Sequence, residues 1–338
     1  MTFPPLPRRP LLLGATAAAA SAAALPPRAV RAQGGATPAW PTRPVRIVVA
    51  FGTGGGTDIT TRLLAPKLSE ILGQPVVVEN RPGGGGTIGA DYVAKQPPNG
   101  ETFLLATLSN MAIALALYPR LPYDPQRDLV GIAPTVFVPI GLAVSGKLGV
   151  RDLAEFIALL KANPDRYSYG SAGSGTTGHI ASTAFLSRIG ARAEHVPYRN
   201  PGQTYLALTQ GEIAFTSDIP SLLAPFHREG TARILFVATD ERSPHVPEVP
   251  TAREAGLGDY KAYSWYGVYA PAGTPQHIVE RFAAAIDQAL GDPAISRRLE
   301  EMGTPGMRGW TPQRFAEFLK SEIDLWVPLT RASGARAD

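Results

Sequence analysis

The sequence predicts an α/β protein with two lobes, each built around a mainly parallel sheet flanked by helices. Three observations lead to this fold. Short apolar runs alternate with amphipathic helical segments twice along the chain. The alternation is interrupted between Val130 and Val144, where two strand-like runs follow each other around Pro139. Three of the apolar runs lead into a Gly/Thr/Ser-rich turn that opens a helix.

The first series has the order βαβαβ. Val45–Phe51 is a nearly continuous apolar run, typical of a strand covered on both faces. Such an order predicts parallel strands with right-handed crossovers. The expected elements are strand 45–51, helix 58–72 ending at Gly73, strand 76–79, helix 87–94 and strand 102–107.

A second α/β series follows the change near Pro139, and it ends with a strand that returns to the first lobe. Its expected elements are helix 152–161, strand 167–170, helix 176–189, strand 194–196, helix 202–209, and strands 213–216, 233–238 and 263–270. Three further helices, each starting near a proline, are expected at 275–290, 293–301 and 312–332. They would complete the first lobe.

The boundaries expected from this pattern are 40–140 plus 264–338 for the first lobe and 141–263 for the second. Two crossings between the lobes produce a cleft. Ligands of open parallel sheets lie beyond the carboxyl ends of the strands, so all three glycine turns could face that cleft.

The glycine turns at Val45–Asp58, Val76–Gly89 and Tyr167–His179 are suited to binding an anion. Each presents unpaired backbone N–H groups and the positive end of a helix dipole. Three such turns without a catalytic cluster indicate a protein that holds a small carboxylate or phosphate without transforming it.

Residues 1–32 have the pattern of a cleaved export signal. Arg8 and Arg9 precede an Ala/Leu run from Leu11 to Leu25, and Val30-Arg31-Ala32 supplies a cleavage pattern. The twin arginines favour the twin-arginine route. The segment's four arginines account for the formal charge of +4, so the exported chain is near neutral.

Composition excludes several classes of protein. A near-neutral chain without clustered Lys and Arg does not favour nucleic-acid binding or a polybasic membrane patch. Because the sequence contains no cysteine, disulfides, thiolate metal sites and lipoprotein anchoring are all excluded. No two of the five histidines stand at i, i+4, which disfavours a metal site, and no G-x-S-x-G elbow occurs.

One glycine turn also fits another class of protein. Gly173–Gly178 has the spacing G-x-G-x-x-G between a strand and a helix, and Glu194 follows about 20 residues later, as in dinucleotide-binding proteins. A rival hypothesis is therefore an exported dinucleotide-dependent oxidoreductase. The first turn is not a P-loop, because no Gly-Lys-Ser/Thr follows it.

Four charged or polar side chains near the turns have two interpretations each. Asp58 is either a first-turn acid or a ligand contact, and His179 is either a packed or capping residue or a functional donor. Asp218 either points into the cleft or belongs to a solvated loop. Arg199 is either a carboxylate clamp or a surface arginine beside a helix start.

The ordered motifs resemble the Bug proteins, the periplasmic substrate-binding components of tripartite tricarboxylate transporters. The segments that carry the resemblance extend from Trp40 to the last helices, in family order. They are Trp40–Val49, Gly55–Asp58, Gly73–Gly83, Leu117–Pro125, Ser171–His179, His195–Tyr198, Arg242–Pro244, Val249–Thr251 and Ala270–Pro275.

The resemblance implies a type II, Venus-flytrap periplasmic binding protein that captures a small organic carboxylate by closing its cleft. It implies no enzymatic activity, no cofactor and no metal. The expected partners are the large and small membrane subunits of a transporter, or alternatively a membrane sensor, and the expected state is a monomer in the periplasm.

The expected ligand contacts come from both lobes. They are Phe51, Gly52, Thr53, Gly54, Thr57, Asp58, Ser109, Asn110, Ser171, Gly173, Thr176, Thr177, His179 and Asp218. Two segments depart from the family pattern. Ala50 stands where the first turn usually has proline, and Ile219 follows Asp218 where the family commonly has asparagine. These departures leave the ligand's identity open.

Overall fold

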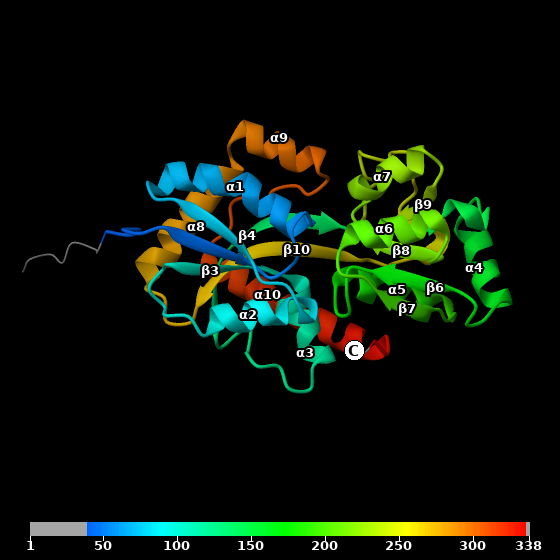
Figure 1. The fold of residues 1–338 in the computed structure, drawn as a ribbon, viewed down its shortest axis with the longest axis horizontal. Helices are drawn as coiled ribbons and strands as arrows, with labels where there is room; N and C mark the ends of the chain where they lie inside the picture. The colour runs from blue at the N-terminus through cyan, green and yellow to red at the C-terminus, as the bar shows by residue number, and fades with distance from the viewer. Residues whose placement is uncertain (1–38, 336–338) are drawn as a thin grey trace, which may run out of the picture. The chain divides into compact units, whose positions relative to one another are not determined.

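Two five-stranded sheets organise residues 39–335, the part of the chain that the computed structural model describes (Figure 1). The export signal expected at residues 1–32 lies outside the described residues. The first sheet has the order β2-β1-β3-β10-β4, and the second has the order β7-β6-β8-β5-β9. We refer to each sheet with its helices as the first and the second lobe.

The strands lie close to their expected positions. Those of the first lobe are β1 (Val45–Val49), β2 (Val76–Asn80), β3 (Thr102–Thr107), β4 (Leu129–Pro139) and β10 (Tyr263–Pro271). Those of the second lobe are β5 (Gly141–Ser145), β6 (Ser168–Ser171), β7 (Glu194–Pro197), β8 (Phe215–Asp218) and β9 (Ala232–Val237). The largest displacement is that of β8, which starts two residues later than expected and ends at Asp218.

Both sheets are mainly parallel, as predicted, but each contains one antiparallel strand. In the first lobe β10 runs against β3 and β4, and in the second β5 runs against β8 and β9. These are the strands by which the chain enters a lobe from the other one. A strand that arrives from the opposite lobe begins where the parallel strands end, so it must run against them.

The helices of the first lobe cover both faces of its sheet (Figure 1). They are α1 (Gly56–Leu72), α2 (Thr87–Ala94), α3 (Ala114–Leu117), α8 (Gln276–Leu290), α9 (Pro293–Glu301) and α10 (Pro312–Ala332). Strand β1 shows why two faces are covered. Ile47 packs in a core cluster with Leu68 of α1, whereas Val48 packs in another with Val93 of α2. Successive side chains of a strand point to opposite faces.

The second lobe is arranged in the same way. Its helices are α4 (Leu153–Ala162), α5 (Thr177–Ile189), α6 (Pro201–Gln210) and α7 (Pro220–Arg228). Phe156 of α4, Phe185 of α5 and Phe215 of β8 form one aromatic cluster, with ring centroids 5.4–6.2 Å apart. The other face packs Leu208 of α6 and Leu223 of α7.

Two α-helices, α3 and α7, were not predicted from the sequence. Ser109–Ile113 forms a wide helical turn that continues into α3, and every residue from Ser109 to Ala114 is buried. A segment buried on all sides lacks the amphipathic periodicity by which helices are recognised. The other is α7, which has prolines at its first position and in its interior.

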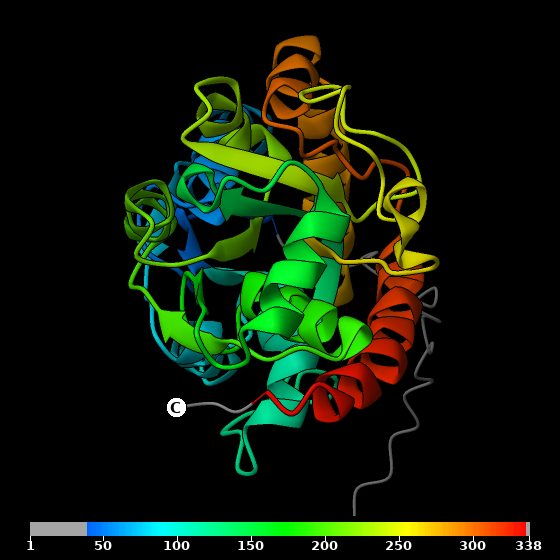
Figure 2. The ribbon, with the colours of Figure 1, turned by 90° about the vertical axis from the view of Figure 1, so that its right-hand side faces the viewer.

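Helix α10 belongs to the first sheet, yet its end reaches α5 of the second lobe (Figure 2). It is held to the first sheet by Glu322, which is 3% exposed. The Glu322 carboxylate accepts hydrogen bonds from the Tyr263 hydroxyl at 2.8 Å and from Trp265 Nε1 at 2.9 Å. Burial raises the pKa of Glu322, and these two donors offset part of that rise.

We expect Glu322→Ala to lower the free energy of unfolding by about 2–4 kcal/mol, because it leaves two buried donors without an acceptor. Urea unfolding followed by circular dichroism would measure the loss. Glu317→Ala is the matched control, because Glu317 lies exposed on the same helix. Equal stability of the two variants would contradict this role of Glu322.

Candidate functional site

A cavity of about 550 Å³ lies where the carboxyl ends of the parallel strands of both sheets meet. Residues from all three glycine turns line it, as expected from the sequence. The backbone and side chains around it are Phe51, Gly52, Gly55–Thr57, Pro82–Gly86, Thr107, Ser109, Tyr118, Val138, Ile140, Ala172–Ser174, Thr176–Gly178, Tyr198–Pro201, Ser217–Ile219, Leu222, Ser264 and Tyr266.

Eight of the fourteen expected contact residues line this cavity. They are Phe51, Gly52, Thr57, Ser109, Gly173, Thr176, Thr177 and Asp218. The other six do not line it. They are Thr53, Gly54, Asp58, Asn110, Ser171 and His179. Four of these six, Asp58, Asn110, Ser171 and His179, have side chains that fix the shape of the turns.

The first glycine turn connects β1 to α1 and is held by Asp58. One oxygen of Asp58 accepts from the Gly54 N–H at 3.0 Å, and the other accepts from Arg62 Nε at 2.9 Å and Asn80 Nδ2 at 3.0 Å. Asn80 also donates to the Phe51 carbonyl at 3.1 Å. Asp58 therefore ties the turn to α1 and β2. Of the two interpretations, a first-turn acid or a ligand contact, these contacts fit the first-turn acid.

The electrostatics of Asp58 follow from these contacts. Burial raises the pKa of its carboxyl. The hydrogen bonds from the Gly54 N–H, Asn80 and Arg62, with the charge of Arg62, lower the pKa by more than burial raises it. The pKa of Asp58 therefore lies below the usual value of 3.8. Asp58 is thus held ionised, although the residue is only 4% exposed.

The second glycine turn, between β2 and α2, reaches across to the second lobe. Gly83, Gly84, Gly85 and Gly86 all have positive φ angles, which side chains rarely adopt. At Gly85 a Cβ atom would lie 3.0 Å from the Ser174 carbonyl oxygen. Glycine there allows the backbones of the second and third turns to approach each other.

The third glycine turn connects β6 to α5 and rests on two stacked imidazoles. His179 Nδ1 accepts from the Gly175 N–H at 3.1 Å, and its ring stacks on His195 with centroids 3.8 Å apart. His195 Nε2 hydrogen-bonds the Ser171 hydroxyl at 2.7 Å. Ser171 and His179 therefore support the turn, and Thr176, the N-cap of α5, lies at the cavity.

Ser109 and Asn110 follow β3 and have different positions. The Ser109 hydroxyl lies at the cavity, 3.3 Å from the Thr177 hydroxyl of the second lobe. The Asn110 side chain is fully buried, accepts from the Thr107 N–H at 2.9 Å and donates to the Gly86 carbonyl at 3.3 Å. Asn110 thus fixes the second turn from within the first lobe.

Asp218, the last residue of β8, faces the cavity instead of belonging to a solvated loop. Its carboxylate accepts from the Tyr205 hydroxyl and from the Ile219 N–H, both at 2.8 Å. Burial raises the pKa of Asp218, and these two donors offset part of the rise.

Further residues at the cavity lie outside the set of expected contacts. Arg199, for which the sequence left two interpretations, a carboxylate clamp or a surface arginine beside a helix start, lies at the cavity just beyond β7. Its guanidinium makes no ion pair with another residue of the 39–335 range. Val138 and Ile140, at the β4–β5 crossing, and Tyr266 of β10 form part of the wall. Val138 and Ile140 lie beside Pro139, where the sequence had located a crossing, whereas Tyr266 lies inside β10 and has no such signal.

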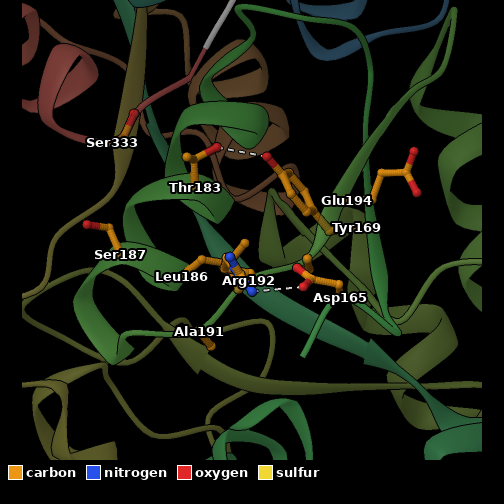
Figure 3. A pocket seen from close by; sticks show the side chains of 10 residues that line it. Asp165, Tyr169, Thr183, Leu186, Ser187, Ala191, Arg192, Glu194 and Ser333 are labelled. Carbon is orange, nitrogen blue, oxygen red and sulfur yellow. Dashed lines mark hydrogen bonds and ion pairs between the residues drawn. The ribbon is translucent and has the colours of Figure 1, made fainter. Parts of the chain in front are cut away.

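A second cavity, of about 490 Å³, lies against α5 in the second lobe (Figure 3). Two pairs of the polar groups drawn there interact. Arg192 pairs with Asp165 at 2.9 Å, and the Tyr169 hydroxyl hydrogen-bonds Thr183 at 2.8 Å. No glycine turn lines it, so we take the larger cavity as the candidate site.

Neither a metal-binding cluster nor a membrane-spanning helix is found in residues 39–335. Within that range no group of three or more His, Asp and Glu side chains is arranged to hold a metal ion. The same range contains no helix with the length and apolarity that a membrane span requires.

Two α/β lobes, connected by two crossings and enclosing a cavity lined by turns from both, define the two-lobed periplasmic binding protein class. Comparison with known proteins identifies the family within this class. Residues 60–334 match the family described as the tripartite tricarboxylate transporter family receptor, TctC, and the chain belongs to this family.

Individual relatives and solved structures support the same family. The chain is 36% identical over 301 residues to BugT of Bordetella pertussis, covering 88% of this chain and 91% of BugT. It is 33% identical to MatC of Rhodopseudomonas palustris, solved with bound malate, with a TM-score of 0.81, covering 86% of this chain and 100% of MatC. It is 35% identical to R. palustris Rpa4515, solved with adipate, with a TM-score of 0.83. The match covers 88% of this chain and 100% of Rpa4515. The resemblance to the Bug proteins is thereby confirmed.

We expect Asp58→Asn to lower the free energy of unfolding by about 1–3 kcal/mol at pH 7, because it weakens three hydrogen bonds to a charged acceptor. Since the pKa of Asp58 is lowered by folding, its contribution is present above the unfolded value near 3.8 and is lost as the pH falls through the folded value. Denaturant unfolding at pH 7 and pH 3 measures this difference.

Glu70→Gln is the control for Asp58→Asn, because Glu70 lies on the same helix but pairs with Lys67 at the surface. Its effect should stay within about 0.5 kcal/mol at pH 7. A destabilisation of Asp58→Asn that is as large at pH 3 as at pH 7 would show that the charge of Asp58 does not hold the turn.

Proposed function

We propose that this chain is the periplasmic solute-binding protein of a tripartite tricarboxylate transporter and captures a small organic carboxylate by closure of its two lobes. The observation that carries the proposal is the convergence of three glycine turns on one cavity, each at the start of a helix. Backbone N–H groups and helix N-termini together favour a bound anion. The malate and adipate bound to MatC and Rpa4515 support a carboxylate as the ligand.

The proposed contacts are those expected residues that also line the cavity. The hydroxyls of Thr57, Thr176, Thr177 and Ser109, with the backbone of the three turns, would replace the water around the ligand carboxylate. The lobe boundaries in this proposal are 40–140 plus 264–338 and 141–263. Closure would bring the two sets of donors onto one ligand, which stabilises the closed state by differential affinity.

The wider setting is part of the same proposal. Residues 1–32 would direct export, by the twin-arginine route, and be removed. The partners would be the large and small membrane subunits of the transporter, or a membrane sensor that reads the same liganded state. The protein would act as a monomer, without enzymatic activity, cofactor or nucleic acid.

We expect a thermal-shift panel on residues 33–338 to show a rise with one class of small carboxylate. The panel contains di- and tricarboxylates, acidic amino acids, aromatic acids and NAD(P). A ligand at about 100 times its dissociation constant adds about 2.7 kcal/mol, which raises the melting temperature by several degrees. A rise with NAD(P) alone would contradict the proposal and favour the dinucleotide-dependent oxidoreductase.

Thr177→Val should weaken binding of that carboxylate about tenfold in isothermal titration calorimetry, because it keeps the side-chain shape and removes one hydroxyl. The melting temperature of the unliganded protein should change little. Thr209→Val is the matched control, because the Thr209 hydroxyl bonds the Leu206 carbonyl on α6, away from the cavity lining. Unchanged affinity in Thr177→Val would count against this site.

A further inference from the structure

Two side chains of opposite charge flank the third glycine turn, and they are the only Arg, Lys, Asp or Glu side chains among the described residues that line the cavity. The order β7-β6-β8 in the second sheet sets their positions. The glycine turn follows β6, Arg199 follows β7 on one side, and Asp218 ends β8 on the other. Neighbouring strands lie about 4.8 Å apart, so both charges are close to the turn.

Asp218 lies directly beside the start of α5. A Cβ atom on Gly178 would lie 2.4 Å from the Ser217 carbonyl oxygen, so the strand end that carries Asp218 packs against the first turn of that helix. An anion bound at the helix start would therefore have a carboxylate as its neighbour. Two neighbouring like charges disfavour binding unless a hydrogen-bond donor lies between them.

The contacts of Asp218 leave it in the role of an acceptor. Both of its oxygens already accept a hydrogen bond, from the Tyr205 hydroxyl and from the Ile219 N–H. Since a carboxyl oxygen has two acceptor positions, each oxygen of Asp218 has one position left for a further donor. The two donors also fix the orientation of the side chain, so its remaining acceptor positions are set before a ligand arrives.

The wall beyond Asp218 offers no positive charge for a second carboxylate. It consists of Ile219 and Leu222 from the second lobe, and of Val138, Ile140 and the Tyr266 ring at the crossings. Among the lining residues of the 39–335 range, the one cationic side chain is Arg199, on the other side of the turn.

We infer that Asp218 is a specificity-determining residue, which selects carboxylic acids that carry a hydroxyl or ammonium donor beside the carboxylate. The carboxylate binds at the start of α5, the donor points to Asp218, and the rest of the ligand lies against the apolar wall. This inference rests on the proposed function and identifies the class of its ligand as hydroxy or amino acids.

The test compares acids that differ only by the donor, using isothermal titration calorimetry on residues 33–338. The pairs are L-malate with succinate, mandelate with phenylacetate, and L-phenylalanine with 3-phenylpropionate. In each pair that binds, we expect the donor-bearing acid to bind at least tenfold more tightly. Tighter or equal binding of the acids without a donor would overturn the inference and leave the carboxylate-binding function standing.

Two variants separate a direct contact from a structural effect. In Asp218→Asn the preference for an ammonium donor should fall to about threefold or less, while the acid without a donor keeps its affinity or gains some. Arg199→Gln should weaken both members of a pair equally and leave their ratio unchanged. A ratio unchanged in Asp218→Asn would overturn the inference, and equal weakening of both acids in that variant would assign Asp218 a structural role.

Failure of the proposed function gives a different result. A folded protein, as judged by circular dichroism, that binds no carboxylate of any pair would overturn both the function and this inference.

Discussion

The direction of the strands is the constraint on which the site depends. In each sheet four strands end at the boundary between the lobes, and the fifth begins there because the chain has just crossed from the other lobe. Parallel strands place their following turns at one edge of a sheet. With two sheets joined by β4–β5 and by the return into β10, these edges face each other. The three glycine turns converge for that reason, although they are far apart in the sequence.

The turns themselves depend on side chains that do not reach the cavity. A backbone that presents its N–H groups to a ligand has to satisfy its other polar groups elsewhere. Asp58 and Asn80 do this for the first turn, Asn110 for the second, and His179 with Ser171 for the third. Polar residues adjacent to a glycine turn are therefore as well suited to shaping it as to contacting a ligand. This explains why several expected contact residues lie outside the cavity lining.

The fold was largely predictable because its signals are local. Apolar runs such as Val45–Val49 and helix ends such as Gly73 identify elements from a few neighbouring residues. The two missed helical segments lack that signal, since Ser109–Leu117 is buried on nearly every side and α7 contains two prolines. The sequence located both crossings, but the antiparallel direction of β5 and β10 depends on which strands become their neighbours, and that is fixed only when both sheets are assembled.

The candidate site was predictable only in part, because it is assembled from distant segments. A motif identifies the residues of a turn, but whether a side chain points outward or inward depends on its tertiary partners. His179 of α5 points inward because His195, from strand β7, stacks on its ring. Arg199, by contrast, lies at the cavity because β7 is the neighbour of β6, a pairing that no local pattern contains.

The same strand pairing explains how one backbone geometry can serve different ligands. The glycine turns offer backbone groups, which any carboxylate can use, so they contribute affinity with little discrimination. Discrimination has to come from side chains at the ends of the flanking strands, where substitutions leave the turns intact. Asp218 and Arg199 occupy those positions here, one on each side of the turn that opens α5. An acid at one of them disfavours a second carboxylate by charge repulsion and favours a donor, so a single strand-end residue can change the class of ligand without altering the fold.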